Sequence, residues 1–141
     1  TGFQLEVGDY NATTLPPFQY EDIGSSMERC KRYCYQIGTG DANYQNIGIH
    51  GIGIGSTIVD TIQPLHPPMR AEPSMTNSGG LEASNGSSAF AATAIAITTV
   101  SNSRQSAGIR LTVGSGISAG SSYRIEQQNS STSVVTLEAE L

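Results

Sequence analysis

The most constraining feature of this chain is a series of short segments in which apolar residues alternate with small or polar ones. These segments are AFAATAIAITTV (89–100), GIRLTVGSG (108–116), YRIEQQ (123–128) and SVVTLEAEL (133–141), with Ser, Gly and Asn between them. Such alternation buries one face of a strand. Short strands separated by turns of this composition are typical of an antiparallel β-sandwich or barrel. We therefore predict a mainly β protein.

Segment 89–100 also admits a helical reading, because alanine is the best helix former. Its Thr and Ile content and the strand patterns around it favour a strand.

The Gly-rich segment 44–63 changes the phase of its alternation. Before residue 50 its isoleucines have odd numbers, and after residue 51 they have even numbers up to Ile58. A phase change predicts a β-bulge or a break between strands near residues 50–51. The glycines lack the surroundings of a dinucleotide or Walker A loop, so we interpret them as sites of close backbone contact.

One helix is predicted. Ser25 or Ser26 can cap it and Gly38 can end it, which predicts a helix over about residues 26–37. The tandem prolines upstream favour extended backbone, so residues 1–24 form an extended lead-in with a short strand at residues 3–7.

The two cysteines lie in this predicted helix. Met27, Cys30 and Cys34 recur at helical spacing, so we expect them to share a buried face as reduced thiols. A disulfide at this spacing would distort the helix. Together with His50 and His66 the cysteines match zinc-ligand patterns poorly, so no metal site is expected.

The charge balance argues against nucleic acid as a partner. The formal net charge is −5, and only 13% of the residues are charged. No apolar run is long enough to insert in a membrane, and no signal peptide is visible. Arg29, Lys31 and Arg32 form the one basic cluster. We interpret Arg29 and Lys31 as solvated, and Arg32 as a structural anchor.

No catalytic signature is present, so the chain is predicted not to be an enzyme and to need no cofactor. The serine-hydrolase elbow is missing, and twelve acidic residues offer carboxylate pairs in any fold. Asp9, Asp41 and Asp60 lie beside Gly, Ser or Thr and are interpreted as turn residues.

The string SMERCKRYCYQ resembles the E-L-x-x-C-Q-R-Y-Y signature of C-terminal domains in tailed-phage fibre, spike and related virion proteins. Met27, Cys30, Arg32 and Tyr33 match, whereas Lys31 replaces Gln and Cys34 replaces the second Tyr. Three further segments match the family in order: QLEVGDYNATTLPPF (Gln4–Gly8 and Thr14–Phe18), PLHPPMRAEPSMT (Pro68, Met69, Arg70 and Pro73) and the closing TLEAEL (Ala139, Glu140 and Leu141).

The resemblance implies a β-sandwich of jelly-roll type with one short N-terminal helix, assembled as a homotrimer. It assigns residues 25–141 to this virion domain. In relatives the lead-in often closes an upstream domain. Thr1 is then either a fragment boundary, which the resemblance favours, or the residue left after removal of an initiator Met.

The implied function is that of a non-enzymatic virion surface domain, with two alternatives. One is the trimeric knob of a tail fibre or spike that attaches to a host surface glycan. The other is a capsid decoration, cement or tail domain that contacts other virion proteins. Either would be assembled in the host cytoplasm and exposed on the particle. An enzyme acting on host polysaccharide is less favoured.

For glycan contacts the sequence offers exposed aromatic rings and one polar segment, TNSGGLEASNGSS (76–88). The candidate tyrosines are Tyr10, Tyr20, Tyr44 and Tyr123. No receptor-binding residue is assigned.

Overall fold

The computed structural model describes residues 22–38, 46–128 and 133–139, together with Asn11, Thr14 and Tyr44. Within these residues it contains one helix and nine strands. They are α1 (Ile23–Lys31), β1 (Cys34–Ile37), β2 (Asn46–Gly53), β3 (Ile58–Pro64), β4 (Ser74–Ser78), β5 (Leu81–Ser84), β6 (Ala89–Ile97), β7 (Ser106–Val113), β8 (Ser122–Gln127) and β9 (Val134–Glu138).

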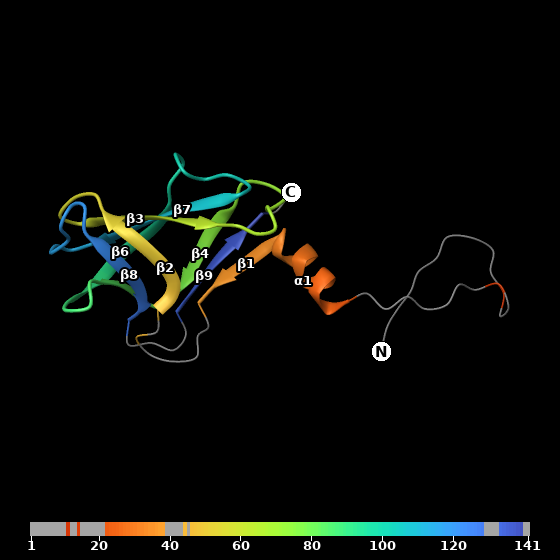
Figure 1. Cartoon of the computed structure of the whole chain (residues 1–141), viewed down its shortest axis with the longest axis horizontal. Coiled ribbons are helices and arrows are strands. Elements are labelled where there is room, and N and C mark those ends of the chain that lie inside the picture. The colour runs from red at the N-terminus through yellow and green to blue at the C-terminus, as the bar shows by residue number, and fades with distance from the viewer. Residues whose placement is uncertain are drawn as a thin grey trace.

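Six strands close into an antiparallel barrel in the order β2-β3-β7-β6-β5-β8, and three form a sheet in the order β1-β9-β4. Figure 1 shows the barrel at one end, the three-stranded sheet beside it, and α1 standing away from both. The predicted mainly β, antiparallel fold with one short helix near the N-terminus is confirmed. The predicted strand at 3–7 and the closing residues Glu140 and Leu141 lie outside the described residues.

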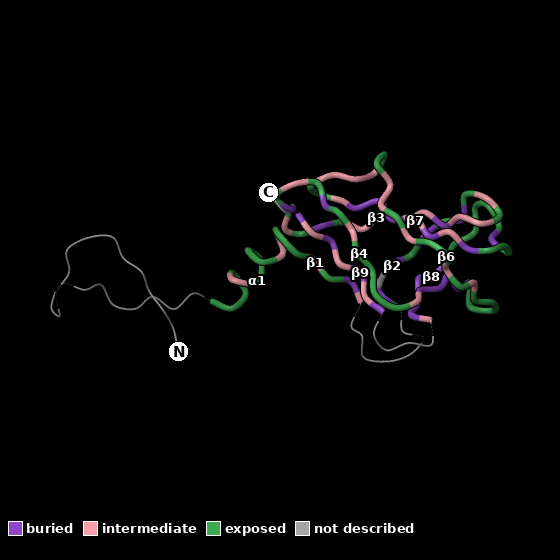
Figure 2. Tube along the Cα trace, turned by 180° about the vertical axis from the view of Figure 1, so that it is seen from behind, coloured by how far each residue is buried: buried purple, intermediate pink, exposed green. Residues whose placement is uncertain are grey.

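The barrel and the small sheet share one apolar core. On β7 the alternating residues Ile109, Leu111 and Val113 are buried, as their period predicts. Val135 and Leu137 of β9 join the same cluster from the other sheet. Figure 2 shows buried positions recurring along the barrel strands and β9, while α1 carries none. The two sheets are therefore parts of one folded unit.

The segment at 89–100 is a strand over Ala89–Ile97, as predicted. Its pairing with β7 shifts register between Ala92 and Ala94. This shift explains why Phe90 and Ile95, which differ in parity, both pack against the core.

The phase change in β2 has a different cause from the predicted bulge near residues 50–51. His50, Gly51 and Ile52 pair with β8 in continuous register, and the irregularity lies upstream, between Asn46 and His50. Gly51 and Gly53 occupy buried positions where a Cβ atom would collide with Val59 and with Ser118. Glycine thus replaces isoleucine on the inner face because the Val59 side chain at Gly51 and the Ser118 backbone at Gly53 leave no room for a side chain.

The helix begins and ends earlier than the predicted range of 26–37. Asp22, rather than Ser25 or Ser26, is the N-cap, and its carboxylate accepts a hydrogen bond from the Ser25 N–H at 3.3 Å. The helix stops at Lys31 because residues 34–37 pair with β9 from Cys34 to Ile37. Sheet pairing here overrides the helical spacing of the cysteines.

Segment 76–88, predicted as a polar loop, is mostly strand. It contains the end of β4, a Gly79–Gly80 turn, and β5, in which all four residues are buried. Only the tip at 85–88 remains a loop. The Asn85 side chain holds that tip by accepting hydrogen bonds from the Ser87 and Ser88 N–H groups.

Candidate functional site

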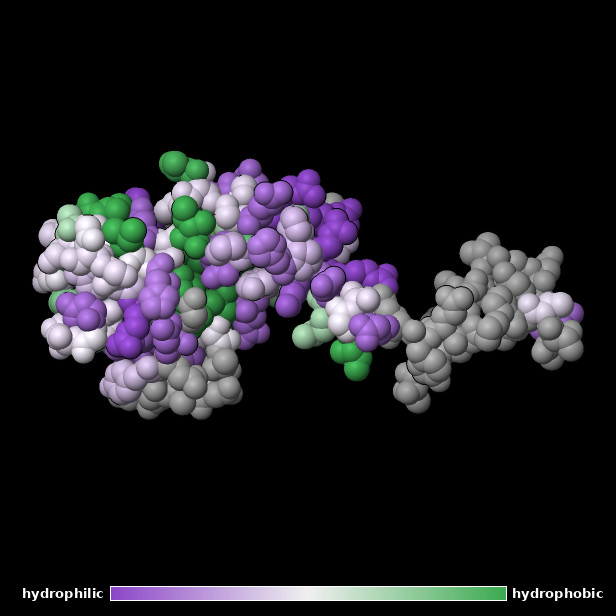
Figure 3. Space-filling model, in the orientation of Figure 1, coloured by the Kyte–Doolittle hydropathy of each residue, from purple (hydrophilic) through white to green (hydrophobic). Residues whose placement is uncertain are grey.

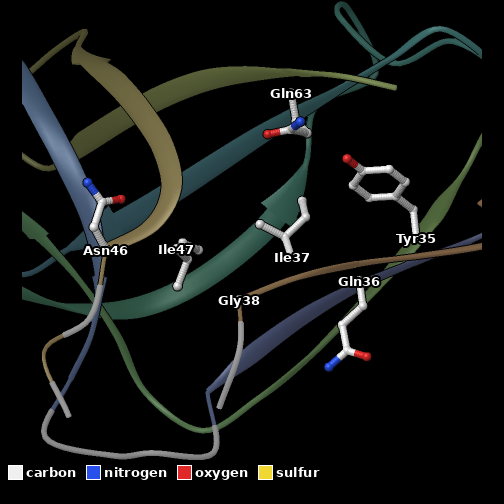
Figure 4. A pocket seen from close by; sticks show the side chains of 7 residues that line it. All are labelled: Tyr35, Gln36, Ile37, Gly38, Asn46, Ile47 and Gln63. Carbon is white, nitrogen blue, oxygen red and sulfur yellow. The ribbon is translucent and has the colours of Figure 1, made fainter. Parts of the chain in front are cut away.

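A hollow lined by both polar and apolar side chains lies where β2 and β3 separate. These strands pair only at Ile52–Asp60 and Gly53–Val59. Toward Asn46 and Pro64 they diverge, and β1, an edge strand of the small sheet, lies beside the gap. The resulting cleft has a volume of about 470 Å³. It is lined by Tyr35, Gln36, Ile37, Gly38, Asn46, Ile47 and Gln63 (Figure 4).

The cleft has an apolar floor between two polar ends. Ile37 and Ile47 are nearly buried, at 6% and 7% exposure, and belong to the core. Figure 4 shows Tyr35 and Gln63 at one end of the cleft and Asn46 at the other. The Gln36 side chain points away from these residues, as alternation along β1 requires.

Two contacts restrain the side chains at the Tyr35 end. The Gln63 Nε2 donates a hydrogen bond to the Pro64 carbonyl at 2.8 Å. The Lys31 Nζ lies 6.0 Å from the centroid of the Tyr35 ring. None of the lining residues is charged. The cleft can therefore hold an uncharged ligand with one apolar face, and its lining supplies no carboxylate or imidazole for proton transfer.

A second hollow, of about 380 Å³, lies on the outer surface of β2 and β3. Its apolar wall consists of Ile52, Ile54 and Ile62, which are 51–60% exposed. The Thr61 hydroxyl donates to the His50 carbonyl at 2.6 Å and bridges the strands where their ladder ends. Figure 3 shows hydrophobic side chains gathered over this part of the barrel.

Asp60 borders this hollow and is a strand residue, so its interpretation as a turn residue is wrong. Its two carboxylate oxygens accept hydrogen bonds from the Nε and Nη2 of Arg110, each at 2.7 Å. This hydrogen bonding, with the charge of Asp60, raises the pKa of Arg110 above its ordinary value. Asp9 and Asp41 lie outside the described residues.

The helix signature and the Pro-Met-Arg segment meet in the fold. The Arg70 N–H donates to the Arg32 carbonyl at 2.8 Å, and the Arg70 Nη1 donates to the Tyr33 hydroxyl at 2.9 Å. The Tyr33 carbonyl accepts a hydrogen bond from the Ala139 N–H at 2.8 Å. Three segments far apart in the sequence therefore converge just after α1 ends.

Met69 anchors the Pro-Met-Arg segment. Its side chain is fully buried, its N–H donates to the Arg104 carbonyl at 2.7 Å, and its carbonyl accepts from the Arg104 Nε at 3.1 Å. Pro73 is buried and its carbonyl accepts from the Asn102 Nδ2, whereas Pro68 is exposed. The structural role predicted for this segment fits these contacts at Met69, Arg70 and Pro73.

The predicted buried face of the helix is wrong. Met27 is 56% exposed, and Cys30 and Cys34 are both exposed and free. Cys34 lies on β1, so the two cysteines do not share a helix face. Arg32 is exposed and contributes its backbone carbonyl to the contact with Arg70. The expectation failed for Cys34 because the helix ends at Lys31, and for Met27 and Cys30 because α1 packs none of its residues into the core.

Glu82 and Glu126 form an acidic pair on β5 and β8. They lie directly opposite each other in the ladder and are 6% and 8% exposed. Burial, and then the charge of Glu126, raise the pKa of the Glu82 carboxyl. Arg124 contacts Glu126 through an Nη2–Oε1 distance of 2.9 Å and offsets part of the repulsion.

The tyrosines proposed for glycan contact differ in how exposed they are. Tyr123 is 2% exposed, and its ring packs edge-on against Phe90 at a centroid distance of 6.2 Å, so it is a core residue. Tyr44 is 57% exposed. Tyr10 and Tyr20 lie outside the described residues. The sequence reasoning missed Tyr35, because assignment to a helix hid its place beside β2 and β3.

Among the described residues, no three His, Cys, Asp or Glu side chains are grouped so that they could hold a metal ion. The one described helix is too short to cross a membrane. No protein-family model, curated protein or solved structure matches the chain.

Proposed function

We propose that the chain is a non-enzymatic surface domain of a tailed-phage virion, serving as the C-terminal trimeric knob of a tail fibre or spike in host attachment. The supporting observation is the sequence resemblance, which spans four segments in order. The fold adds a physical reason for two of them to occur together. Arg32 and Tyr33 of the helix signature bond directly to Arg70 of the Pro-Met-Arg segment.

Assembly as a homotrimer is supported by apolar side chains that the single chain leaves exposed. Ile23 and Met27 of α1 are 79% and 56% exposed, and the isoleucines of β2 and β3 form a second apolar area. A nine-residue helix without buried residues has little stability alone in water. A second copy that covers these areas would stabilise both of them. The finer jelly-roll description of the barrel and its small sheet stays part of this proposal.

A capsid decoration, cement or tail domain is the second candidate, and one observation favours it. Figure 1 shows α1 standing away from the barrel, in the manner of an arm that docks on another protein. In that case the partner of the helix would be a different virion protein rather than a second copy.

The first test is the mass of the purified chain in solution, measured by light scattering. We expect a trimer of three 14.8 kDa chains. Ile62→Asp, on the exposed apolar area, should shift the mass toward monomer. Thr76→Asp, on the exposed face of edge strand β4, should leave it unchanged. A monomeric wild-type chain would contradict the trimeric assembly on which the knob proposal depends.

A further inference from the structure

We propose that the cleft between β1, β2 and β3 binds an uncharged sugar unit of a surface polysaccharide. The inference rests on the proposed host-attachment function, and it adds the site and the chemical class of the ligand. It uses the side chains of Tyr35, Ile37, Asn46, Ile47 and Gln63, whereas the Gln36 side chain points away from the cleft and takes no part in the site (Figure 4).

The chemistry of the lining matches a pyranose ring. A sugar ring has C–H faces that pack against aromatic and aliphatic groups, and a rim of hydroxyls that need donors and acceptors. Tyr35, Ile37 and Ile47 supply the apolar surface, and the carboxamides of Gln63 and Asn46 stand at opposite ends of the cleft (Figure 4). Carboxamides both donate and accept, as a hydroxyl rim requires. The volume of about 470 Å³ falls within the usual range for small-ligand sites.

Backbone groups add fixed polar contacts along the walls. Among the described strands β1 pairs only with β9, so its other edge is open. The ladder between β2 and β3 ends at Ile52–Asp60, and beyond it the Thr61 hydroxyl bridges to the His50 carbonyl before the strands separate. Open strand edges present N–H and C=O groups at fixed spacing. Such rigid groups lose little entropy when a ligand binds.

The lining also bears on the charge that the ligand can carry and on whether the site could cleave it. With no charged side chain on the walls, the cleft favours a neutral sugar over a phosphorylated or sulfated one. The Lys31 Nζ lies 6.0 Å from the centroid of the Tyr35 ring. Glycoside hydrolysis commonly uses two carboxyl groups, and none of the described lining residues carries one. The proposed role of these residues is therefore to hold the sugar.

The test measures binding of the chain to an array of immobilised sugars. The array carries glucose, galactose, mannose and N-acetylglucosamine, disaccharides built from these four neutral sugars, and the charged sugar glucuronic acid. The same substitution, glutamine to methionine, is made at one position inside the cleft and at one position outside it. Gln63→Met removes the carboxamide inside the cleft, and Gln36→Met removes the one that points away from it. We expect Gln63→Met to weaken binding about tenfold and Gln36→Met to leave it unchanged.

Tyr35→Leu tests the aromatic wall and should weaken binding about fivefold, since an aromatic contact is worth about 1 kcal/mol. Tyr35 packs partly on the core, so its variant is accepted only if its thermal melting matches that of Gln63→Met. Binding should be insensitive to salt. A preference for glucuronic acid that weakens with added salt would assign recognition to Lys31 and overturn the neutral-sugar proposal.

The outcomes separate this site from the proposed function. A trimeric chain that binds sugars equally well in all three variants overturns the cleft and leaves host attachment standing. A trimeric chain that binds none of the array sugars also overturns the cleft, while the virion role remains. A monomeric chain that binds none of them contradicts both proposals.

Discussion

The barrel and the helix differ in how far they bury their apolar residues, although they belong to one chain. On β7 five of the eight residues are buried, whereas the helix α1 buries none of its nine residues. The barrel closes most of its own hydrogen-bond ladder, except where β2 and β3 separate, and closure leaves few sheet edges. The helix satisfies its backbone locally and leaves its apolar side chains to water. The difference indicates which part of the molecule folds for itself and which part awaits a contact.

The sharpest test of this contrast replaces one apolar residue in each region. Leu111→Ala removes a fully buried side chain and should lower the free energy of unfolding by about 2–5 kcal/mol. Ile23→Ala, on the helix that the single chain leaves exposed, should change it by less than about 0.5 kcal/mol in the monomeric chain. Urea denaturation at a protein concentration that keeps the chain monomeric measures both. A large loss for Ile23→Ala under these conditions would break the comparison, whereas a loss that appears only in the trimer would show that a second copy covers the helix.

The junction between the two regions should show a smaller effect. Arg70→Ala removes the bond to the Tyr33 hydroxyl and the stacking of the guanidinium on the Tyr33 ring, whose centroid lies 5.5 Å from Cζ. We expect a loss of about 1 kcal/mol, because the contact is exposed. Arg32→Ala is the matched control and should have little effect, because Arg32 acts through its carbonyl. If thermal denaturation showed the same loss of stability for Arg32→Ala as for Arg70→Ala, the Arg32 side chain would itself be a structural anchor.

The smallest effect is expected within the barrel and depends on pH. The pKa of Glu82 is raised in the folded state by burial and by Glu126, so the folded protein binds this proton more tightly than the unfolded chain does. The resulting stability is present below the ordinary pKa of 4.5 and is lost as the pH rises through the raised value. Glu82→Gln should therefore be more stable than the wild type at pH 7 and should lose this advantage below pH 4.5.

The matched control is Glu72→Gln, at an exposed position after the Pro-Met-Arg segment. Its difference from the wild type should stay constant across the same pH range in a denaturation series. A constant difference for Glu82→Gln as well would show that the barrel tolerates the paired carboxylates without strain.

Much of the fold followed from period-two patterns. The strands around Ile109, Ile125 and Leu137 lie where the alternation predicts, because each has one buried face. The pattern failed where tertiary contacts outweigh local preference. Cys34 follows Cys30 at helical spacing, but the pairing of residues 34–37 with β9 makes them a strand. At Gly51 the sequence shows a missing side chain, while the reason, a close approach to Val59, exists only in three dimensions.

The cleft could not be predicted from the sequence, because it depends on where two strands stop pairing. Tyr35 and Gln63 lie on β1 and β3, which belong to different sheets. Neither residue belongs to a recognisable motif. By contrast, the contact of Tyr33 with Arg70 joins two segments that the sequence had already singled out. Motifs therefore identified the structural junction, and geometry alone identified the candidate binding site.

The position of α1 also determines how the molecule would bear a mechanical load. A pull transmitted through the helix enters β1 almost directly, because only Arg32 and Tyr33 separate the two elements. The part of such a pull that lies along β1 loads the four register pairs between Cys34–Glu138 and Ile37–Val135 together, in shear, rather than opening them one after another. The contacts of Arg70 with Arg32 and Tyr33 lie at the point where that force enters. The chain would then resist detachment best when it is pulled along β1.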